Sequence, residues 1–481
     1  MKYDIFGRRA VRRGARGWRL LLLLPSAAVL GGCASLEAGG GFEAVAQTTK
    51  AHIGKDLQRA RSEADLDTMA PRVAELLAKP LTVDDAVQVA LLNNRGLQAG
   101  FQELGITEAE VVQAGRLPNP GFSFGRSSKG DEREIERGLH FSLARLVTLP
   151  LIERMEARRL QQVQARVALS VLALAADTRK AYFTALAAEE TVRYMRQVKQ
   201  AAEASAELAR RMEQVGNFNK LQRAREQSFY ANAALQLARA EQAQRSSRER
   251  LVRLLGLWGG QTQFRLPTRL PDLPPAPLEL PDIEQVALAQ RLDVLEAKQA
   301  AAQTASNLGL TRATRFINVL ELGLVRNSSN EAPTQRGWEV SLELPVFDWG
   351  GARVARAEAV YMQALHRAAE TAINARSEVR EAYTAYRTAY DIARHHRDEV
   401  VPLSQRIAEE NLLRYNGMLI GVFELLADAR TQIASVNGAI EALRDFWIAQ
   451  ADLDMALIGK PSLAAAAGPA MAGRSAAGPG H

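Results

Sequence analysis

Two carboxylates near the C-terminal end of the chain have the spacing that points most directly to chemistry. Glu424 and Asp428 are four positions apart, so in a helix both lie on one face. Carboxylates gathered at a narrow opening favour cations and disfavour anions, and their mutual repulsion raises some of their pKa values. The alternative is a pair of solvated surface acids, and the residues alone leave both interpretations open.

The remaining reactive side chains form no catalytic pattern. The chain has 6 histidines, and only His395 and His396 are adjacent. Neighbours on a helix point about 100° apart, and no second cluster of His or Cys accompanies the pair, so solvent-facing histidines are favoured over a metal site. Nothing resembles a catalytic triad, a phosphate loop or a metal cage. The prediction is therefore a protein that is not an enzyme and that has neither a metal nor a cofactor, apart from a covalent lipid.

The one cysteine, Cys33, ends a segment with the layout of a secretory signal. Residues 1–32 contain seven Lys and Arg against Asp4, then an apolar run that is too short to span a bilayer. Leu30-Gly31-Gly32-Cys33 resembles the lipobox of bacterial lipoproteins, in which the cysteine carries the lipid. A chance cysteine is the alternative. Because this leader holds most of the net charge of +7, the rest of the chain is nearly neutral and nucleic-acid binding is not expected.

Two very long helical hairpins organise the rest of the chain. Between Pro150 and Pro267 there is no proline, and strong helix formers dominate. The first arm would be about 95 Å long at ~1.5 Å per residue, which indicates a coiled coil. The turn residues are Val215, Gly216 and Asn217 in the first hairpin and Asn416, Gly417 and Met418 in the second. Gly216 and Gly417 are 201 positions apart, as are Tyr182 and Tyr383, and this constant offset indicates an internal duplication.

Each repeat also contains a pair of segments with alternating apolar and polar residues. Phe122 and Phe124 alternate with small residues, and Trp338, Val340 and Leu342 alternate with polar ones. This is typical of a membrane β-barrel strand, although a soluble hairpin with one buried face would give the same pattern. Residues 126–137 and 327–336 are predicted as loops. Since four strands cannot close a barrel and open edges are not tolerated in lipid, several protomers would have to share one barrel.

The predicted organisation has six parts in chain order. They are a lipoprotein signal peptide (1–32), a lipidated N-terminal tether (33–80), repeat 1 (81–265, with strands at about 120–147 and a hairpin at about 150–256), a Pro-rich linker (266–281), repeat 2 (282–460, with strands at about 316–346 and a hairpin at about 351–459) and a disordered tail (461–481). A first helix capped by Thr82 should run to about Arg116, and Pro402 should kink or split the last long helical run.

These features together resemble the TolC-type outer-membrane efflux proteins. The resemblance rests on the lipobox, the duplicated helix–strand–strand–long-helix unit, the glycine turns and the sequence Leu344-Pro345-Val346-Phe347-Asp348-Trp349-Gly350-Gly351 before a long helix. It covers residues from about 80 to 459. One departure is Leu146-Val147-Thr148-Leu149-Pro150, which replaces the glycine-rich corner in the first repeat and leaves the geometry of that corner open.

The resemblance implies a mainly α fold with a membrane β-barrel portion. Three chains would form a homotrimeric, 12-stranded barrel in the outer membrane of a Gram-negative bacterium, continued by a periplasmic α-helical barrel. The hairpin turns would contact a periplasmic adaptor protein that connects to an inner-membrane pump of the resistance-nodulation-division (RND) type. Glu424 and Asp428 would form the periplasmic gate, and Cys33, followed by Ala34, would anchor the chain to outer-membrane lipid.

The function that follows is a passive exit duct for small molecules or metal ions. A type I secretion duct shares the fold and is an alternative. From another class, a periplasmic adaptor lipoprotein would have one hairpin between β-rich domains, whereas this chain has two hairpins and little β-structure. The cargo, the partner pump and the gate contacts cannot be derived from the sequence.

Overall fold

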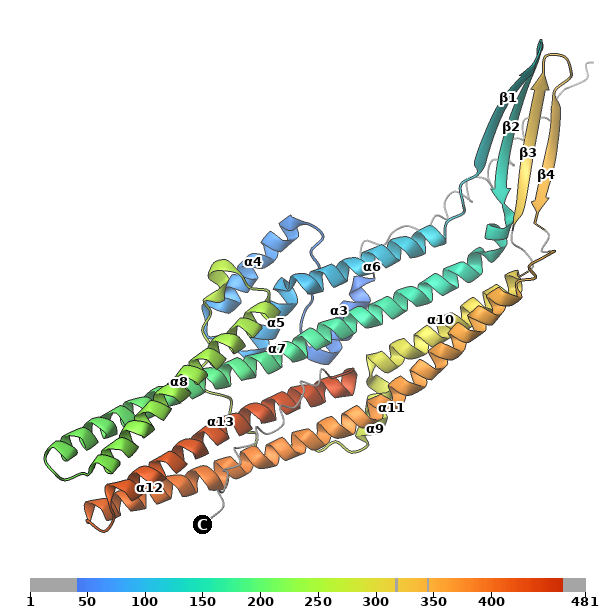
Figure 1. The fold of residues 1–481 in the computed structure, drawn as a ribbon. Coiled ribbons are helices and arrows are strands. Elements are labelled where there is room, and N and C mark those ends of the chain that lie inside the picture. The colour runs from blue at the N-terminus through green and yellow to red at the C-terminus, as the bar shows by residue number, and fades with distance from the viewer. Residues whose placement is uncertain (1–40, 316–318, 344–345, 462–481) are drawn as a thin grey trace, which may run out of the picture. The chain divides into compact units, whose positions relative to one another are not determined.

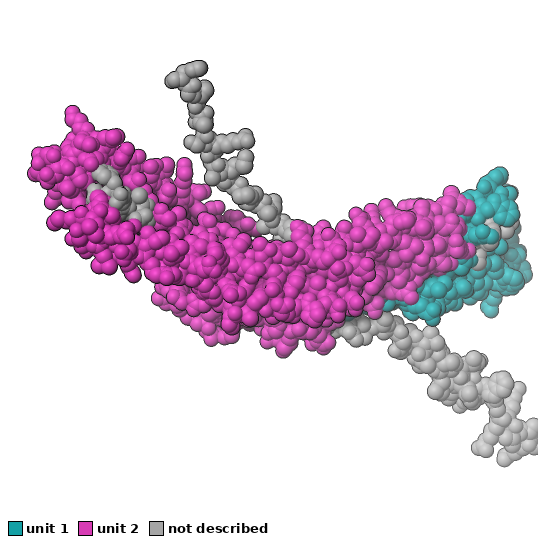
Figure 2. All heavy atoms as spheres, turned by 90° about the horizontal axis from the view of Figure 1, so that it is seen from below, with its two compact units in different colours: residues 1–40, 108–157, 313–350 teal, residues 41–107, 158–312, 351–481 magenta. Residues whose placement is uncertain are grey.

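The computed structural model describes residues 41–315, 319–343 and 346–461, and for residues 422–429 it describes the backbone alone. The chain divides into two compact units (Figure 2). Unit 1 takes in residues 108–157 and 313–350 and contains all four described strands, whereas the described residues of unit 2, within 41–107, 158–312 and 351–461, are mostly helical. The predicted mainly α fold with antiparallel strands is confirmed.

Residues 42–78, predicted as part of a tether, instead form two packed helices. These are α3 (Phe42–Ile53) and α4 (Glu63–Ala78). Ser62 caps α4 in a reciprocal arrangement with Asp65. Val45 of α3 and Val73 of α4 are buried against helices that follow later in the chain. The tether prediction is wrong for these residues. It rested on the mixed composition of the segment and overlooked apolar side chains, such as Val45 and Val73, that are buried in the core.

The first predicted helix begins where expected but consists of two. Thr82 caps α5 (Val83–Asn93) by accepting a hydrogen bond from the Asp85 N–H, and α6 (Arg95–Ala114) follows after a break at Asn94. The backbone of Asn94 is extended there, with φ −69° and ψ 114°. Its side chain accepts from the Leu97 N–H and donates to the Leu254 carbonyl, so the break is held by specific bonds.

The first long hairpin consists of α7 (Leu143–Gln214) and α8 (Lys220–Leu255). We expected the helix to start at Pro150 and the strand to reach about residue 147, and both expectations are wrong. The helix begins at Leu143, where the Ser142 hydroxyl accepts a hydrogen bond from the Arg145 N–H at 3.4 Å. Pro150 lies inside the helix, even though an internal proline lacks one backbone donor.

The second half has the same succession of elements. After the 3₁₀ turn η1 (Gly259–Thr262) and an extended proline-rich segment come α9 (Ile283–Gln290), α10 (Leu292–Thr314), two strands, α11 (Gly351–His395), a π-helical turn η2 (His396–Val400), α12 (Val401–Asn416) and α13 (Val422–Ile458) (Figure 1). Pro402 lies in the first turn of α12, directly after η2. The long helical run is thus interrupted at the proline, as predicted.

The strands form one antiparallel sheet in the order β1-β2-β3-β4. They are β1 (Gly121–Lys129), β2 (Glu132–Ser142), β3 (Leu320–Ser329) and β4 (Gln335–Leu342). The loop prediction is wrong for residues 126–137, where all but 130 and 131 lie in β1 or β2, and it is right for the centre of 327–336, where residues 330–334 connect β3 to β4. Asn330 connects the two hairpin ends: its side chain accepts from the Arg133 N–H and donates to the Asp131 carbonyl.

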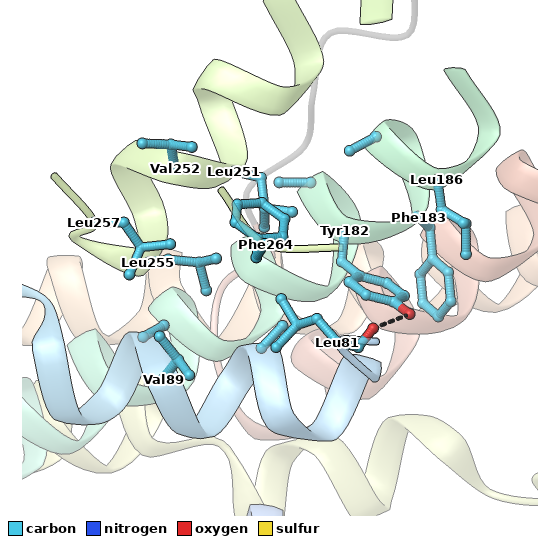
Figure 3. Close-up of a cluster of buried hydrophobic side chains, with 14 of the residues drawn as sticks. Leu81, Val89, Tyr182, Phe183, Leu186, Leu251, Val252, Leu255, Leu257 and Phe264 are labelled. Carbon is cyan, nitrogen blue, oxygen red and sulfur yellow. Dashed lines mark hydrogen bonds between the residues drawn. The ribbon is translucent and has the colours of Figure 1, made fainter. Parts of the chain in front are cut away.

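Side chains of α4, α5, α7 and α8 form one core of unit 2. Leu81, Val89, Phe183 and Leu251 are buried there (Figure 3). Tyr182 is also buried, and its hydroxyl donates to the Leu81 carbonyl at 2.9 Å. Because that carbonyl precedes the first turn of α5 and is buried, the hydrogen bond removes the cost of leaving it unpaired.

The proline-rich segment is bound along its length. Tyr390 donates a hydrogen bond to the Pro275 carbonyl at 2.9 Å, and the Tyr386 hydroxyl accepts from the Leu278 N–H at the same distance. The Trp447 indole N–H donates to the Pro271 carbonyl at 3.1 Å. Tyr386 and Tyr390 are buried, and their hydroxyl groups also position the extended segment.

The break between α9 and α10 repeats the break between α5 and α6. The Arg291 N–H donates to the Ala287 carbonyl, as the Asn94 N–H does to the Ala90 carbonyl. The side chain at each break also donates a hydrogen bond to a carbonyl near the end of a later helix. Asn94 donates to Leu254 of α8, and Arg291 donates to Ala456 of α13. The two halves thus share the same contact at the helix break, formed by the neutral amide of Asn94 in one half and by the guanidinium of Arg291 in the other.

Candidate functional site

The sheet of unit 1 separates its side chains sharply by type. Residues paired directly across neighbouring strands lie on the same face. One face, which we call the apolar face, carries eleven apolar residues with five arginines and two serines. The apolar residues are Phe122, Phe124, Ile135, Leu139, Phe141, Leu320, Leu322, Leu324, Trp338, Val340 and Leu342. Of these, Phe122, Leu324 and Trp338 are among the exposed large apolar side chains of the chain.

The opposite face, the polar face, holds every glutamate of the strands. These are Glu132, Glu134, Glu136, Glu321 and Glu339. Small and polar residues fill most of the remaining places, and the Ser123 hydroxyl lies 3.0 Å from Nε2 of His140. A sheet with one exposed apolar face and one polar face can separate an apolar medium from water.

The turn of the first hairpin closes α7 in a regular way. Gly216 has φ 81°, its N–H donates to the Glu213 carbonyl, and the Asn217 N–H donates to the Met212 carbonyl. This is the Schellman pattern, in which the residue after the helix takes the left-handed conformation that suits glycine. Asn219 then caps α8. The predicted turn residues Val215, Gly216 and Asn217 therefore do form the turn.

The second hairpin has the same turn, but a different residue takes the left-handed position. Met418 has φ 59°, whereas Gly417 has φ −78°. The Met418 N–H donates to the Tyr415 carbonyl and the Leu419 N–H to the Arg414 carbonyl. The structural counterpart of Gly216 is thus Met418, and the equivalence of Gly216 with Gly417 is wrong by one residue.

Both turns present apolar side chains to solvent. Val215 is 71% exposed, Met418 93% and Leu419 77%. The two turns lie at the same end of unit 2 (Figure 1). Exposed apolar side chains gathered at one end are typical of a surface that binds another protein.

The predicted gate lies on the first turns of α13, close to the second turn. Glu424 and Asp428 belong to this helix, but their side chains are outside the described residues, as is Cys33 as a whole. The structure therefore tests neither the gate nor the lipidation site.

A buried carboxylate joins the two hairpins near these turns. Glu226 of α8 is only 1% exposed. It accepts a hydrogen bond from the Ser205 hydroxyl at 2.9 Å and lies 3.7 Å from a guanidinium nitrogen of Arg430 on α13. The Arg430 guanidinium also stacks 4.5 Å from the centre of the Phe229 ring. Because breaking a buried ionic contact leaves a charge without a partner, this contact resists separation of the hairpins.

No described cluster of His, Cys, Asp and Glu has the arrangement that holds a metal ion. His395 is exposed and lies 3.4 Å from Glu399 one turn later. His396 opens the π-helical turn, and its ring faces the backbone of Gly438 in α13. Within the described residues no helix is both long enough and apolar enough to cross a bilayer.

Sequence reasoning missed the five arginines of the apolar face. The run Glu132-Arg133-Glu134-Ile135-Glu136-Arg137 reads as a polar loop by composition. Its period of two, however, is the signal of a strand that sends glutamate to one side and arginine to the other.

Comparison with known proteins gives relatives at moderate distance. No protein-family model matches the chain. The cobalt-zinc-cadmium resistance protein CzcC of Cupriavidus metallidurans is 25% identical over 290 residues, an alignment that covers 58% of this chain and 67% of CzcC.

Solved structures resemble the chain over most of its length. The CmeC outer membrane channel of Campylobacter jejuni matches with a TM-score of 0.68 and 18% identity over 78% of this chain and 85% of that one. The Neisseria gonorrhoeae MtrE outer membrane channel, solved in an open state, matches with a TM-score of 0.66 and 19% identity over 78% of this chain and 89% of that one. At these identities the likeness establishes a shared fold.

Proposed function

We propose that this chain, a TolC-type outer-membrane efflux protein by its fold and by its relation to CzcC, is the outer-membrane channel of a tripartite efflux pump. The observation that carries the proposal is the sheet of unit 1. It has one exposed apolar face, one polar face and unpaired outer edges on β1 and β4. Such edges cannot remain open in lipid. The proposal supplies their partners from further copies of the same chain.

Three chains would close one barrel of twelve strands. In the order β1-β2-β3-β4 the outer strands run in opposite directions, so β4 of one chain can pair antiparallel with β1 of the next. The apolar face then meets lipid, and the polar face, with its five glutamates, lines the water-filled duct. The hairpins joining β1 to β2 and β3 to β4 would lie on the extracellular side.

The helical hairpins would form the periplasmic part of the duct. The exposed apolar residues at the turns, Val215, Met418 and Leu419, are suited to contact a periplasmic adaptor that connects to an RND-type pump. A lipid on Cys33 would anchor the N-terminus in the outer membrane. A periplasmic adaptor is not favoured as the identity of this chain itself, because the matched structures with stated roles are outer membrane channels.

Metal ions are the cargo class that the comparisons favour, because CzcC is by name a cobalt, zinc and cadmium resistance protein. A ring of Glu424 and Asp428 from three chains would favour cations at the periplasmic opening. A type I secretion duct would have the same fold. Export of metal salts from cells that carry this chain with an adaptor and an RND-type pump, compared with export of a secreted protein, distinguishes the two.

Ion conductance in planar bilayers tests the channel and the gate together. Purified wild type should conduct with a preference for cations, and Glu424→Gln with Asp428→Asn should reduce that preference severalfold. The matched control is Glu63→Gln with Asp67→Asn, an exposed pair with the same spacing on α4. Unchanged selectivity in the gate variant would reject the gate, whereas no conductance in any variant would reject the channel.

Disulfide crosslinking tests the shared barrel. Cysteines placed one in β1 and one in β4 should join neighbouring chains, and oxidation should give a ladder that ends at three. Crosslinks that stop at two chains, or that never form in membranes, would contradict the trimer.

A further inference from the structure

The apolar face of the sheet carries an unexplained cluster of positive charge. Its five arginines are Arg126, Arg133, Arg137, Arg326 and Arg336. All five are exposed. We propose that these arginines bind the phosphate groups of anionic lipids in the outer leaflet of the membrane. This proposal rests on the channel function, which places the apolar face in lipid.

Three of the arginines stand side by side. Arg137 pairs with Arg326, and Arg326 pairs with Arg336, so one row across three adjacent strands holds three guanidinium groups. Neighbouring strands are about 4.8 Å apart, which places the outer two backbones roughly 10 Å apart. Like charges directly opposite each other on a sheet are destabilising. Anions in front of the row would relieve this repulsion.

The described part of the chain does not supply these anions. Every glutamate of the strands lies on the polar face, and the strand residues of the apolar face include no acid. Among the described residues, none forms an ion pair with any of the five guanidinium groups. Within the described part of the chain these guanidinium groups have no acidic partner, so a lipid phosphate can supply the counter-charge.

The position of the row indicates a lipid as the source. The next row toward the helical end of the sheet is Phe122, Leu139, Leu324 and Trp338. Toward the hairpins, the next row holds Arg126, Ile135 and Ser328, and the last row holds Ser128 and Arg133. Aromatic residues mark the edge of the apolar layer in membrane barrels. The guanidinium groups therefore begin where the acyl chains would end, at the depth of the lipid phosphates.

Arginine suits this role better than lysine. Its planar group donates two parallel hydrogen bonds to a phosphate and keeps its charge in a partly apolar setting. A soluble anion would satisfy the charge but would leave the neighbouring aromatic row uncovered. An amphiphile with a phosphate head and acyl chains covers both.

Equilibrium binding of fluorescent bisphosphorylated lipid A to the full-length protein in neutral detergent tests the proposal. Unlabelled lipid A should compete, whereas its dephosphorylated form and inorganic phosphate should compete at least tenfold more weakly. Arg137→Gln with Arg326→Gln and Arg336→Gln should weaken binding by at least about tenfold, the loss expected when charge-assisted hydrogen bonds are removed. The corresponding lysine variant keeps the charge but loses the paired hydrogen bonds, so it should bind more weakly than wild type and more tightly than the glutamine variant.

The matched control removes three charges from the opposite face of the same sheet. Glu132→Gln with Glu134→Gln and Glu136→Gln should bind lipid A at least as well as wild type. The single variant Arg326→Gln, in a strand paired on both sides, should be measurably weaker and serves if the triple variant fails to fold.

Three results would overturn the proposal. The first is equal affinity of wild type and the arginine variants for lipid A, and the second is equal competition by lipid A and its dephosphorylated form. The third is competition by inorganic phosphate at the concentrations at which lipid A competes, which would indicate a site for free phosphate. Conductance in bilayers of pure phosphatidylcholine tests the channel function separately from lipid binding, since wild type and the arginine variants should both conduct there. Loss of conductance in both would instead count against the channel.

Discussion

Replacement of Arg291 by alanine should loosen the junction of α9, α10 and the end of α13. The Arg291 side chain is 1% exposed and lies 2.7 Å from an Asp293 oxygen and 2.6 Å from a Glu378 oxygen. Burial alone would lower the pKa of Arg291, but its hydrogen bonds to the two carboxylates outweigh burial and raise the pKa above its ordinary value. The guanidinium is therefore charged at every pH at which the protein is folded.

The size of the destabilisation follows from the two carboxylates that the substitution leaves without a cation. Asp293 and Glu378 are themselves only 18% and 16% exposed in their side chains, so two carboxylates would face each other without their shared cation. Removing one partner of a buried ionic cluster costs about 3–5 kcal/mol. The equilibrium for local opening should therefore rise by about two to four orders of magnitude.

Hydrogen exchange followed by mass spectrometry on the detergent-purified protein measures this directly. The Arg291 N–H donates to the Ala287 carbonyl and the Leu295 N–H to the Arg291 carbonyl, so peptides that span residues 287–295 should exchange faster by that factor. Peptides from α4, which packs in a core cluster with no residue of α9 or α10, should exchange at the rate of wild type.

A second variant separates charge imbalance from lost packing. Arg291→Met combined with Asp293→Asn and Glu378→Gln removes all three charges together and should recover most of the protection, because a buried ionic cluster adds little over a neutral replacement of similar volume. Wild-type exchange in the alanine variant, or a triple variant no better than the single one, would refute the reasoning.

Two further predictions concern single side chains. Burial, reinforced by the negative charge of Asp85, raises the pKa of Tyr182 to about 12. Between pH 10 and pH 12 the folded protein therefore keeps a proton that the unfolded chain loses. The free energy of unfolding should be unaffected below about pH 10 and should fall by about 3 kcal/mol toward pH 12. Urea midpoints should therefore drop more between those pH values in wild type than in Tyr182→Phe, and equal drops would contradict the assignment. Met418→Gly should stabilise the second turn by about 1 kcal/mol, because Met418 has φ 59° and only glycine takes this conformation without cost. Slower proteolysis at this turn would support it, and Gly216→Ala should have the opposite effect at the first turn.

Local chemistry predicted several boundaries correctly. Thr82 caps a helix, Gly216 closes one, and Pro402 interrupts a long run, because each effect depends on residues within one turn. The apolar alternation around Phe122 and Trp338 likewise indicated strands from side chains alone.

The wrong predictions share a dependence on distant contacts. Pro150 is accommodated within α7, which a rule about proline would exclude. The strands extend through residues that look like loops, because pairing with β3 stabilises the charged half of β2. Nothing near Met418 marks it rather than Gly417 as the left-handed residue.

The candidate site was predictable only in part. The turn residues were located by glycine and helix patterns, whereas the partners of Glu226 and Arg291 come from helices far away in the sequence. No local signal distinguishes these two buried charges from the many exposed ones on the same helices.

The paired helix breaks at Asn94 and Arg291 have a consequence for symmetry. An assembly of three identical chains with internally duplicated halves would be nearly sixfold, with six equivalent breaks around its axis. Amide and guanidinium would alternate around that ring, so the true symmetry would be threefold. The two halves of the chain differ at this break: Arg291 is bound by the carboxylates of Asp293 and Glu378, whereas Asn94 forms hydrogen bonds with the backbone of Leu97 and Leu254. The same place in the fold thus carries a charged side chain in one half of the chain and a neutral side chain in the other.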